Sequence, residues 1–263
     1  MSEDEAVYYE HAGGVGVLTL NRPDNRNSMT VELLDAFVDA VAEARRDTDA
    51  RCVVITGKGR CFSAGADLTA NLQKDGARPL QPHERSYAMY EPFLSVLDIE
   101  VPVIGALNGH TVGGGLGLAL VCDIRIGNRE AKYGANFARL GLHPGMAISY
   151  ILPRVVGVSR AAEMLFGGEL IDGAEAERIG LLSHAVDAED VVPRATTLAN
   201  RIAQNAPIAV RMTKQTFYEG LHWNVRAAAM KEAFAQAVTL ETNDVKEGID
   251  ALLQKRDPNF SGT

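Results

Sequence analysis

The sequence is poor in cysteine and has no long apolar run. Its three cysteines, Cys52, Cys61 and Cys122, form no CxxC pair and have no neighbouring histidines, so neither a disulfide framework nor a zinc site is indicated. Residues 2–5 are acidic where a signal peptide begins with basic residues, and no apolar run reaches the roughly 18 residues of a membrane span. We therefore predict a cytoplasmic protein with no bound metal and no membrane partner.

Basic residues are also scarce. Lysine and arginine number 26 against 34 aspartates and glutamates, and the net charge of −8 argues against nucleic acid as the main partner. With 46% hydrophobic and 23% charged residues the composition is that of a folded globular chain, which excludes extensive disorder. A site for an anionic small molecule must therefore be a local feature of the surface.

The hydrophobic pattern alternates between strands and helices. A hairpin is expected over 7–20 around Gly13-Gly14, and Thr30 is a suitable N-cap for an amphipathic helix over 31–46. This alternation predicts the α/β class with parallel βαβ units, and helices dominate after Ser149. Further strands are expected at 51–56, 103–107, 122–127 and 132–136, a helix at 87–97, and a loop covering an active site at 69–82.

Two glycine-rich turns follow predicted strands. Gly113, Gly114 and Gly115 lie between a strand and the apolar helical run 116–121, and a second turn, 63–67, follows strand 51–56. The first N–H groups of a helix have no intrahelical partner and carry partial positive charge, so bare glycine backbone lets an anion approach them. The pattern favours stabilisation of an oxyanion or a phosphate.

Two other enzyme classes fit the glycines less well. A serine hydrolase elbow around Ser63 needs glycine at position 61, where the chain has Cys61. A phosphate-binding P-loop needs serine or threonine after Gly57-Lys58 and glycine at position 52, but the chain has Gly59 and Cys52. Both classes are disfavoured.

Six segments in order resemble the crotonase superfamily, the enoyl-CoA hydratase/isomerase family. The resemblance implies a crotonase-like stack of ββα units, with residues 1–200 forming the α/β core domain and 201–263 a C-terminal helical trimerisation region. It further implies a homotrimer or homohexamer. The segments are NRP (21–23), FSAGADL (62–68), NGHTVGGGLGLALVCDIR (108–125), LGLHPG (140–145), LPRVVG (152–157) and KEGIDALLQKRDPNF (246–260).

The resemblance also implies a site for a coenzyme A thioester as substrate, with no permanently bound cofactor. In the family two backbone N–H groups hold the thioester carbonyl, and the matching positions are Ala66 and Gly114. Such donors stabilise the enolate that forms on the thioester oxygen. Arg22 or Arg26 is expected to meet the coenzyme A phosphates. The remaining positions implied to line the coenzyme A site are Asn27, Ser28, Met29, Ala64, Asp67, Leu68 and Phe260.

The chain departs from the family at its acid–base positions. Family hydratases use two glutamates, which match Gly117 and Phe137 here, and some isomerases carry a carboxylate at the position of Gly145. Because adding water to a double bond needs one group to activate water and one to protonate carbon, we expect standard hydration to be lost. His143 is the first candidate replacement, since imidazole titrates in the useful range. The others are His110, Glu91, Tyr87 and His83.

Two classes of function remain open. One is an acyl-CoA enzyme, a lyase or isomerase, that uses an oxyanion hole to stabilise a thioester enolate and performs isomerisation, decarboxylation or thioester hydrolysis. The other is a non-catalytic acyl-CoA binding protein. The acyl chain length is not determined by the sequence.

Overall fold

A computed structural model describes residues 5–67, 81–221 and 224–263. Leu68 and nearly all of the loop expected at 69–82 lie outside these residues. The described residues resume at 81, and the helix labelled α2 begins at Pro82.

The larger of two sheets contains six strands in the order β1-β2-β3-β5-β7-β10. All neighbours are parallel except β1 and β2, which form the predicted antiparallel hairpin. The residues of β3 and β5 are almost all buried, as expected for parallel strands covered on both faces. The strands are β1 (Val7–Ala12), β2 (Val15–Leu20), β3 (Cys52–Gly57), β5 (Val103–Leu107), β7 (Ile124–Asn128) and β10 (His184–Val186).

A smaller sheet has the strand order β4-β6-β8-β9. After each of β3, β5 and β7 in the larger sheet, the chain enters the smaller sheet as the next strand, so strand pairs repeat along the chain. This alternation is the stack of ββα units that the resemblance implied. The strands are β4 (Cys61–Ser63), β6 (His110–Val112), β8 (Lys132–Gly134) and β9 (Ile171–Asp172).

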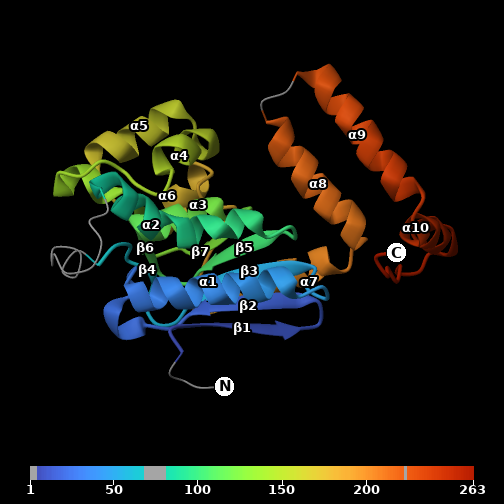
Figure 1. Cartoon of the computed structure of the whole chain (residues 1–263), viewed down its shortest axis with the longest axis horizontal. Helices are drawn as coiled ribbons and strands as arrows, with labels where there is room; N and C mark the ends of the chain where they lie inside the picture. Colours follow the sequence, from blue (N-terminus) through green and yellow to red (C-terminus); the bar gives the residue numbers. More distant parts are fainter. Residues whose placement is uncertain (1–4, 68–80, 222–223) are drawn as a thin grey trace.

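Helices cover both faces of the larger sheet (Figure 1). On one face, α1 (Val31–Arg46) buries Phe37 in the core that includes Val53 and Ile55, while alternate residues of β3 face α7 (Val191–Ala203). The bounds of α1 agree with the prediction because its start has a strong local signal: Thr30 Oγ1 accepts the Leu33 N–H at 3.2 Å. Successive residues of β3 therefore pack against helices on opposite faces, and the sheet lies between two helical layers.

Other boundaries differ from the sequence prediction. The helix α2 (Pro82–Leu94) starts five residues before the predicted Tyr87, because Gln81 and Glu84 form a capping box. Strand β7 begins at Ile124, since Cys122 is the C-cap of α3 (Gly114–Val121). The other helices of the core are α4 (Ile148–Val156), α5 (Val158–Gly167), α6 (Gly173–Arg178) and the 3₁₀ turns 23–25, 95–98, 136–140 and 188–190.

Three C-terminal helices form an arm beside the core, comprising α8 (Pro207–Gly220), α9 (Val225–Leu240) and α10 (Asn243–Gln254) (Figure 1). Lys214 on α8 anchors the arm, with its Nζ 2.9 Å from an Asp123 carboxylate oxygen. Three apolar residues of α9, Met230, Phe234 and Val238, are exposed in the single chain, Phe234 by 66%. The division at residue 200 stays a prediction, and α7 ends three residues beyond it at Ala203. No helix in the described part of the chain is long and apolar enough to cross a membrane.

Candidate functional site

The two glycine turns meet at one edge of the smaller sheet. Strands β4 and β6 pair in parallel, with Ser63 opposite Thr111, so the turn after β4 and the start of α3 after β6 lie side by side. At Gly65, where φ is +83°, an added Cβ would lie 2.6 Å from the Gly114 nitrogen. Only glycine allows this approach, because the position needs both a left-handed backbone and no side chain.

The N–H groups of Ala66 and Gly114 are not used by the described part of the chain. Met29 pairs with Ala66 as an isolated parallel bridge in which the Met29 N–H donates to the Gly65 carbonyl at 2.8 Å. Such a bridge uses the peptide groups on either side of Ala66 and leaves its own N–H pointing away. Gly114 is the first residue of α3, where intrahelical partners are lacking. Within the described residues neither N–H has a hydrogen-bond acceptor.

A cavity of about 810 Å³ opens beside the first of these turns. It brings together Arg26, Ser28, Ala64, Ala66 and Asp67 of the sequence-predicted site, which come from two segments separated by α1 and β3. The other residues that line it are Asp24, Asn25, Arg60, Cys61, His110, Val112, Lys132, Asn136 and Leu170.

The cavity is locally basic in an acidic protein. Its lining includes three basic residues, Arg26, Arg60 and Lys132, and two acidic ones, Asp24 and Asp67. Burial raises the pKa of the Cys61 thiol, and the nearby Arg26 and Arg60 guanidiniums partly oppose that rise. Arg22, the alternative to Arg26, instead pairs with Glu32. The local charge suits a phosphate-bearing ligand. Arg60, in a turn, and Lys132, the first residue of β8, were missed because isolated cations give no sequence signal.

His110 also lines the cavity, and its backbone contact fixes its tautomer. The Lys132 backbone N–H donates to His110 Nδ1 at 3.0 Å. An Nδ1 that accepts a hydrogen bond carries no proton, so Nε2 bears the hydrogen in the neutral ring. His110 is thus suited to donating a hydrogen bond into the cavity, and a role as base would require Nε2 to lose that hydrogen.

Two residues predicted to line the coenzyme A site have buried side chains. Asn27 is fully buried, and its Nδ2 donates to the carbonyls of Lys58, Cys61 and Phe62 at 2.9 to 3.1 Å. Met29 is 4% exposed, and an added Cβ on Gly114 would lie 2.3 Å from its sulfur. Both therefore support the two turns from beneath. Their predicted contact with the ligand stays a prediction, as does that of Leu68, which lies outside the described residues.

Ser63 has the environment of a structural serine. It is fully buried, and its hydroxyl donates to the Asn27 carbonyl at 2.8 Å and accepts the Gly65 N–H at 3.2 Å. A nucleophile must instead be exposed to its substrate beside a base. These contacts reinforce the sequence argument against a serine hydrolase.

Apolar side chains occupy two of the positions at which family members carry carboxylates. An added Cβ on Gly117 would lie 2.3 Å from Met146 Cβ and 2.9 Å from its Cγ, so Met146 fills the space of a side chain at 117. The ring of Phe137 approaches the glycine loop, 3.9 Å from an added Cβ on Gly113. Met146 was not foreseen, because its contact with α3 depends on the tertiary structure.

A tyrosine occupies the third such position. An added Cβ on Gly145 would lie 2.5 Å from the Tyr90 hydroxyl oxygen and 2.6 Å from Cζ. Tyr90 is partly buried and packs against the core, whereas Tyr87 and Glu91 on the same helix are exposed. His83 is exposed as well. Helix α2 therefore turns Tyr90 inward, while the three candidates taken from it by sequence face outward.

His143 lies on the exposed surface of the loop before α4. Its Nδ1 is 2.7 Å from the Pro144 carbonyl oxygen. It is not among the residues that line the cavity, and its acid–base role stays a prediction.

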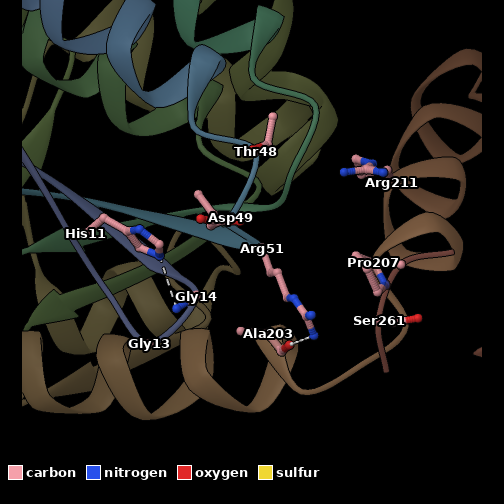
Figure 2. A pocket seen from close by; sticks show the side chains of 12 residues that line it. His11, Gly13, Gly14, Thr48, Asp49, Arg51, Ala203, Pro207, Arg211 and Ser261 are labelled. Carbon is pink, nitrogen blue, oxygen red and sulfur yellow. Dashed lines mark hydrogen bonds between the residues drawn. The ribbon is translucent and has the colours of Figure 1, made fainter. Parts of the chain in front are cut away.

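A separate cavity of about 420 Å³ lies at the opposite end of β3, beside Arg51 and the β1–β2 turn (Figure 2). It contains none of the residues predicted for the site. Arg51 donates to the carbonyls of Ala203 at 3.3 Å and Phe260 at 2.9 Å, which holds the C-terminal tail against the core of the same chain. Within one chain Phe260 is thus far from Ala66, and its predicted contact with coenzyme A would require a neighbouring subunit.

Comparison with known proteins places this architecture among acyl-CoA enzymes. The profile described as enoyl-CoA hydratase/isomerase matches residues 10–263. Crotonyl-CoA hydratase of Syntrophomonas wolfei is 35% identical over 97% of this chain and 98% of that protein. The 2,3-dehydroadipyl-CoA hydratase of Escherichia coli is 35% identical over 94% of each chain. The crystal structure of an enoyl-CoA hydratase from Bacillus anthracis superposes with a TM-score of 0.91 at 30% identity, covering 98% of this chain and 100% of that chain.

Proposed function

Because the chain belongs to the enoyl-CoA hydratase/isomerase family, we propose that it binds an acyl-CoA thioester and stabilises the enolate of that thioester. The thioester oxygen lies between the N–H groups of Ala66 and Gly114. The coenzyme A moiety occupies the cavity beside Arg26. The observation that carries the proposal is the contact between the two turns, in which Gly65 approaches the Gly114 nitrogen and both neighbouring N–H groups lack acceptors among the described residues.

Fixed donors of this kind account for a large part of catalysis on thioesters. They point at the place where negative charge develops and need no reorganisation during the reaction, so removing one typically costs about 3 to 4 kcal/mol, or 10²- to 10³-fold in rate. The cations Arg26, Arg60 and Lys132 support binding of the coenzyme A phosphates, because they line the same cavity.

Hydration of an enoyl-CoA is not the reaction that these residues favour. Crotonyl-CoA hydratase is the name of a relative at 35% identity, but this chain has Gly117 and Phe137 in place of the two glutamates. Loss of one positioned acid–base group usually costs about 10²- to 10⁴-fold. We expect crotonyl-CoA to bind and to be hydrated far more slowly than by a glutamate-bearing relative.

The substitution Gly114→Val tests the proposal. The valine side chain collides with Met29 and keeps the acyl group from the donor loop, so turnover of acyl thioesters should fall at least 10²-fold. The matched control is Gly167→Val, since nothing lies within 4 Å of an added Cβ on Gly167. Calorimetric titration with crotonyl-CoA and turnover of a panel of enoyl and malonyl-type thioesters are measured on both variants, after a melting curve establishes that each is folded.

The outcomes separate the candidate functions. Full activity in folded Gly114→Val removes the assignment of Gly114. Saturable binding without turnover of any thioester identifies a non-catalytic acyl-CoA binding protein, and release of free thiol identifies a thioesterase. Rapid hydration of crotonyl-CoA by the native protein contradicts the argument from the missing glutamates.

A further inference from the structure

The cavity beside Arg51 lies where three parts of the chain meet (Figure 2). The core contributes the turn between β1 and β2 and residues 48–51, the first half of α8 contributes Arg211, and the C-terminal tail contributes residues 261–262. None of these residues lines the cavity proposed for coenzyme A. A ligand bound here would therefore contact the core, the arm and the tail at once.

Two arginines make this cavity basic. Arg51 lines it from the core, and Arg211 extends toward it from α8 (Figure 2). Asp49 is the one carboxylate among the described lining residues, and neither arginine forms an ion pair with it or with any other described residue. The walls of the cavity therefore carry an excess of positive charge, although the protein as a whole is acidic.

Arg51 is held in position by neutral groups. Its guanidinium donates to the Ala203 carbonyl at 3.3 Å and to the Phe260 carbonyl at 2.9 Å. These bonds fix the orientation of a partly buried side chain but neutralise none of its charge. A guanidinium fixed in this way favours an anionic ligand, because hydrogen bonds to carboxylate or phosphate are roughly twice as strong as those to neutral groups.

Two other carboxylates that bind residues of the lining are already hydrogen-bonded to the protein. Asp47 accepts the Tyr9 hydroxyl at 2.8 Å and two backbone N–H groups of the turn that follows it. Asp244 is only 3% exposed and accepts two backbone N–H groups of the tail, at 2.7 and 2.9 Å. Both carboxylates shape the walls of the cavity and leave the charge of its two arginines uncompensated.

His11 adds no charge to the cavity. Its Nε2 accepts the Gly14 N–H at 3.1 Å, and its Nδ1 lies 3.3 Å from an Asp47 carboxylate oxygen (Figure 2). A ring nitrogen that accepts an N–H carries no hydrogen, so the hydrogen is on Nδ1 and the ring is neutral. The positive charge of the cavity therefore comes from Arg51 and Arg211, which keep their charge at any physiological pH.

The arginines are remote from the points where the described segments break off. Glu5 precedes the end of β1 that is opposite to the β1–β2 turn. Asp67 lines the other cavity. Leu221 lies about 15 Å along α8 from Arg211. The charged groups around Arg51 and Arg211 thus belong to well-described parts of the chain.

We propose that this cavity binds a small oxyanion, a carboxylate or phosphate group, between Arg51 and Arg211. A guanidinium presents its N–H donors in a planar fork that matches the paired oxygens of both groups. The volume of about 420 Å³ is that of a site for a small molecule. Because Arg51 belongs to the core and Arg211 to the arm, the bound anion ties the arm to the core. This site is separate from the one proposed for the acyl thioester.

The test compares native protein with Arg211→Gln and with the control Arg201→Gln. Both changes remove one positive charge, but Arg201 is exposed on α7 and does not line the cavity. Each protein is titrated calorimetrically with inorganic phosphate and with citrate, at fixed pH and with sodium chloride keeping the ionic strength constant. Melting curves are recorded under the same conditions, and the curve in chloride alone shows that each variant is folded.

Native protein should bind one anion per chain, and the tighter of the two probes identifies the preferred group. At about ten times Kd the melting temperature should rise by roughly 3 to 6 °C. Arg211→Gln should bind about tenfold or more weakly, because a charge-assisted hydrogen bond is lost, and Arg201→Gln should behave as native. Arg211→Lys keeps the charge but loses the planar fork, so its affinity should be intermediate.

An Arg26→Gln variant separates this site from the cavity proposed for coenzyme A. If anion binding is lost in Arg26→Gln and kept in Arg211→Gln, the anion occupies that other cavity and the inference is wrong. It is also wrong if neither probe binds saturably, or if Arg211→Gln and Arg201→Gln bind as tightly as native protein. Titration with crotonyl-CoA tests only the proposed function, so either assignment can fail while the other stands.

Discussion

The contact between Gly117 and Met146 gives a quantitative prediction for the substitution Gly117→Ala. Alanine normally stabilises a helix interior relative to glycine by about 0.5 to 1 kcal/mol. Here the new Cβ would lie 2.3 Å from Met146 Cβ, against 3.4–4 Å for an ordinary contact. Because a Cβ is attached directly to the backbone, rotation of the Met146 side chain cannot relieve the overlap. The backbone of α3 or of the loop must move.

Such overpacking costs about 1 to 3 kcal/mol, so Gly117→Ala should destabilise the protein despite its better helix propensity. For a chain of this size about 1 kcal/mol shifts the melting temperature by roughly 2 to 4 °C. Thermal unfolding at one fixed protein concentration measures the effect, since association of subunits also changes apparent stability. Gly167→Ala is the control, because space is open around Gly167, and its melting temperature should not fall.

A double-mutant cycle with Met146→Gly isolates the contact. Met146 has φ +57°, which glycine adopts without strain, although losing the buried side chain costs about 2 to 5 kcal/mol. In the Met146→Gly background, Gly117→Ala should become neutral or stabilising, a coupling of about 1 to 4 kcal/mol. The same reasoning requires Met146→Gly before a glutamate fits at 117. Stabilisation by Gly117→Ala alone, or additive effects, would refute the packing of Met146 over Gly117.

Two further predictions concern the C-terminal arm. Lys214→Met should destabilise the protein by about 3 to 5 kcal/mol in urea unfolding, because it leaves Asp123 without its ion-pair partner where both side chains are only 15% exposed. The control Lys231→Met breaks the ion pair with Glu219, whose two side chains are about 40% exposed, and should cost less than about 1 kcal/mol. Equal effects would contradict the anchoring role of Lys214. The apolar residues exposed on α9 should pack against neighbouring subunits, so native protein at micromolar concentration should sediment as a trimer or hexamer and Phe234→Asp as a smaller species; a native monomer would contradict this expectation.

Local signals in the sequence were sufficient for much of the fold. The hairpin follows from Gly13-Gly14 between alternating hydrophobic residues, and the start of α1 follows from Thr30, whose side chain caps the helix. These features depend on residues a few positions apart, so a pattern in the chain records them. The strands that bring the two glycine turns together, β4 (Cys61–Ser63) and β6 (His110–Val112), were not predicted, and only the family resemblance implied that the turns share a site.

The tertiary structure alone decided how the empty carboxylate positions are filled. The sequence showed that glutamates were missing at 117 and 137, and it pointed to His143 and to residues of the helix before the central strand. Only packing showed that Met146 lies over Gly117 and that Tyr90, rather than Tyr87 or Glu91, turns inward onto Gly145. Which face of α2 meets the loop before α4 depends on how two segments far apart in the chain pack together, and no local pattern of hydrophobicity, capping or turn residues carries that information.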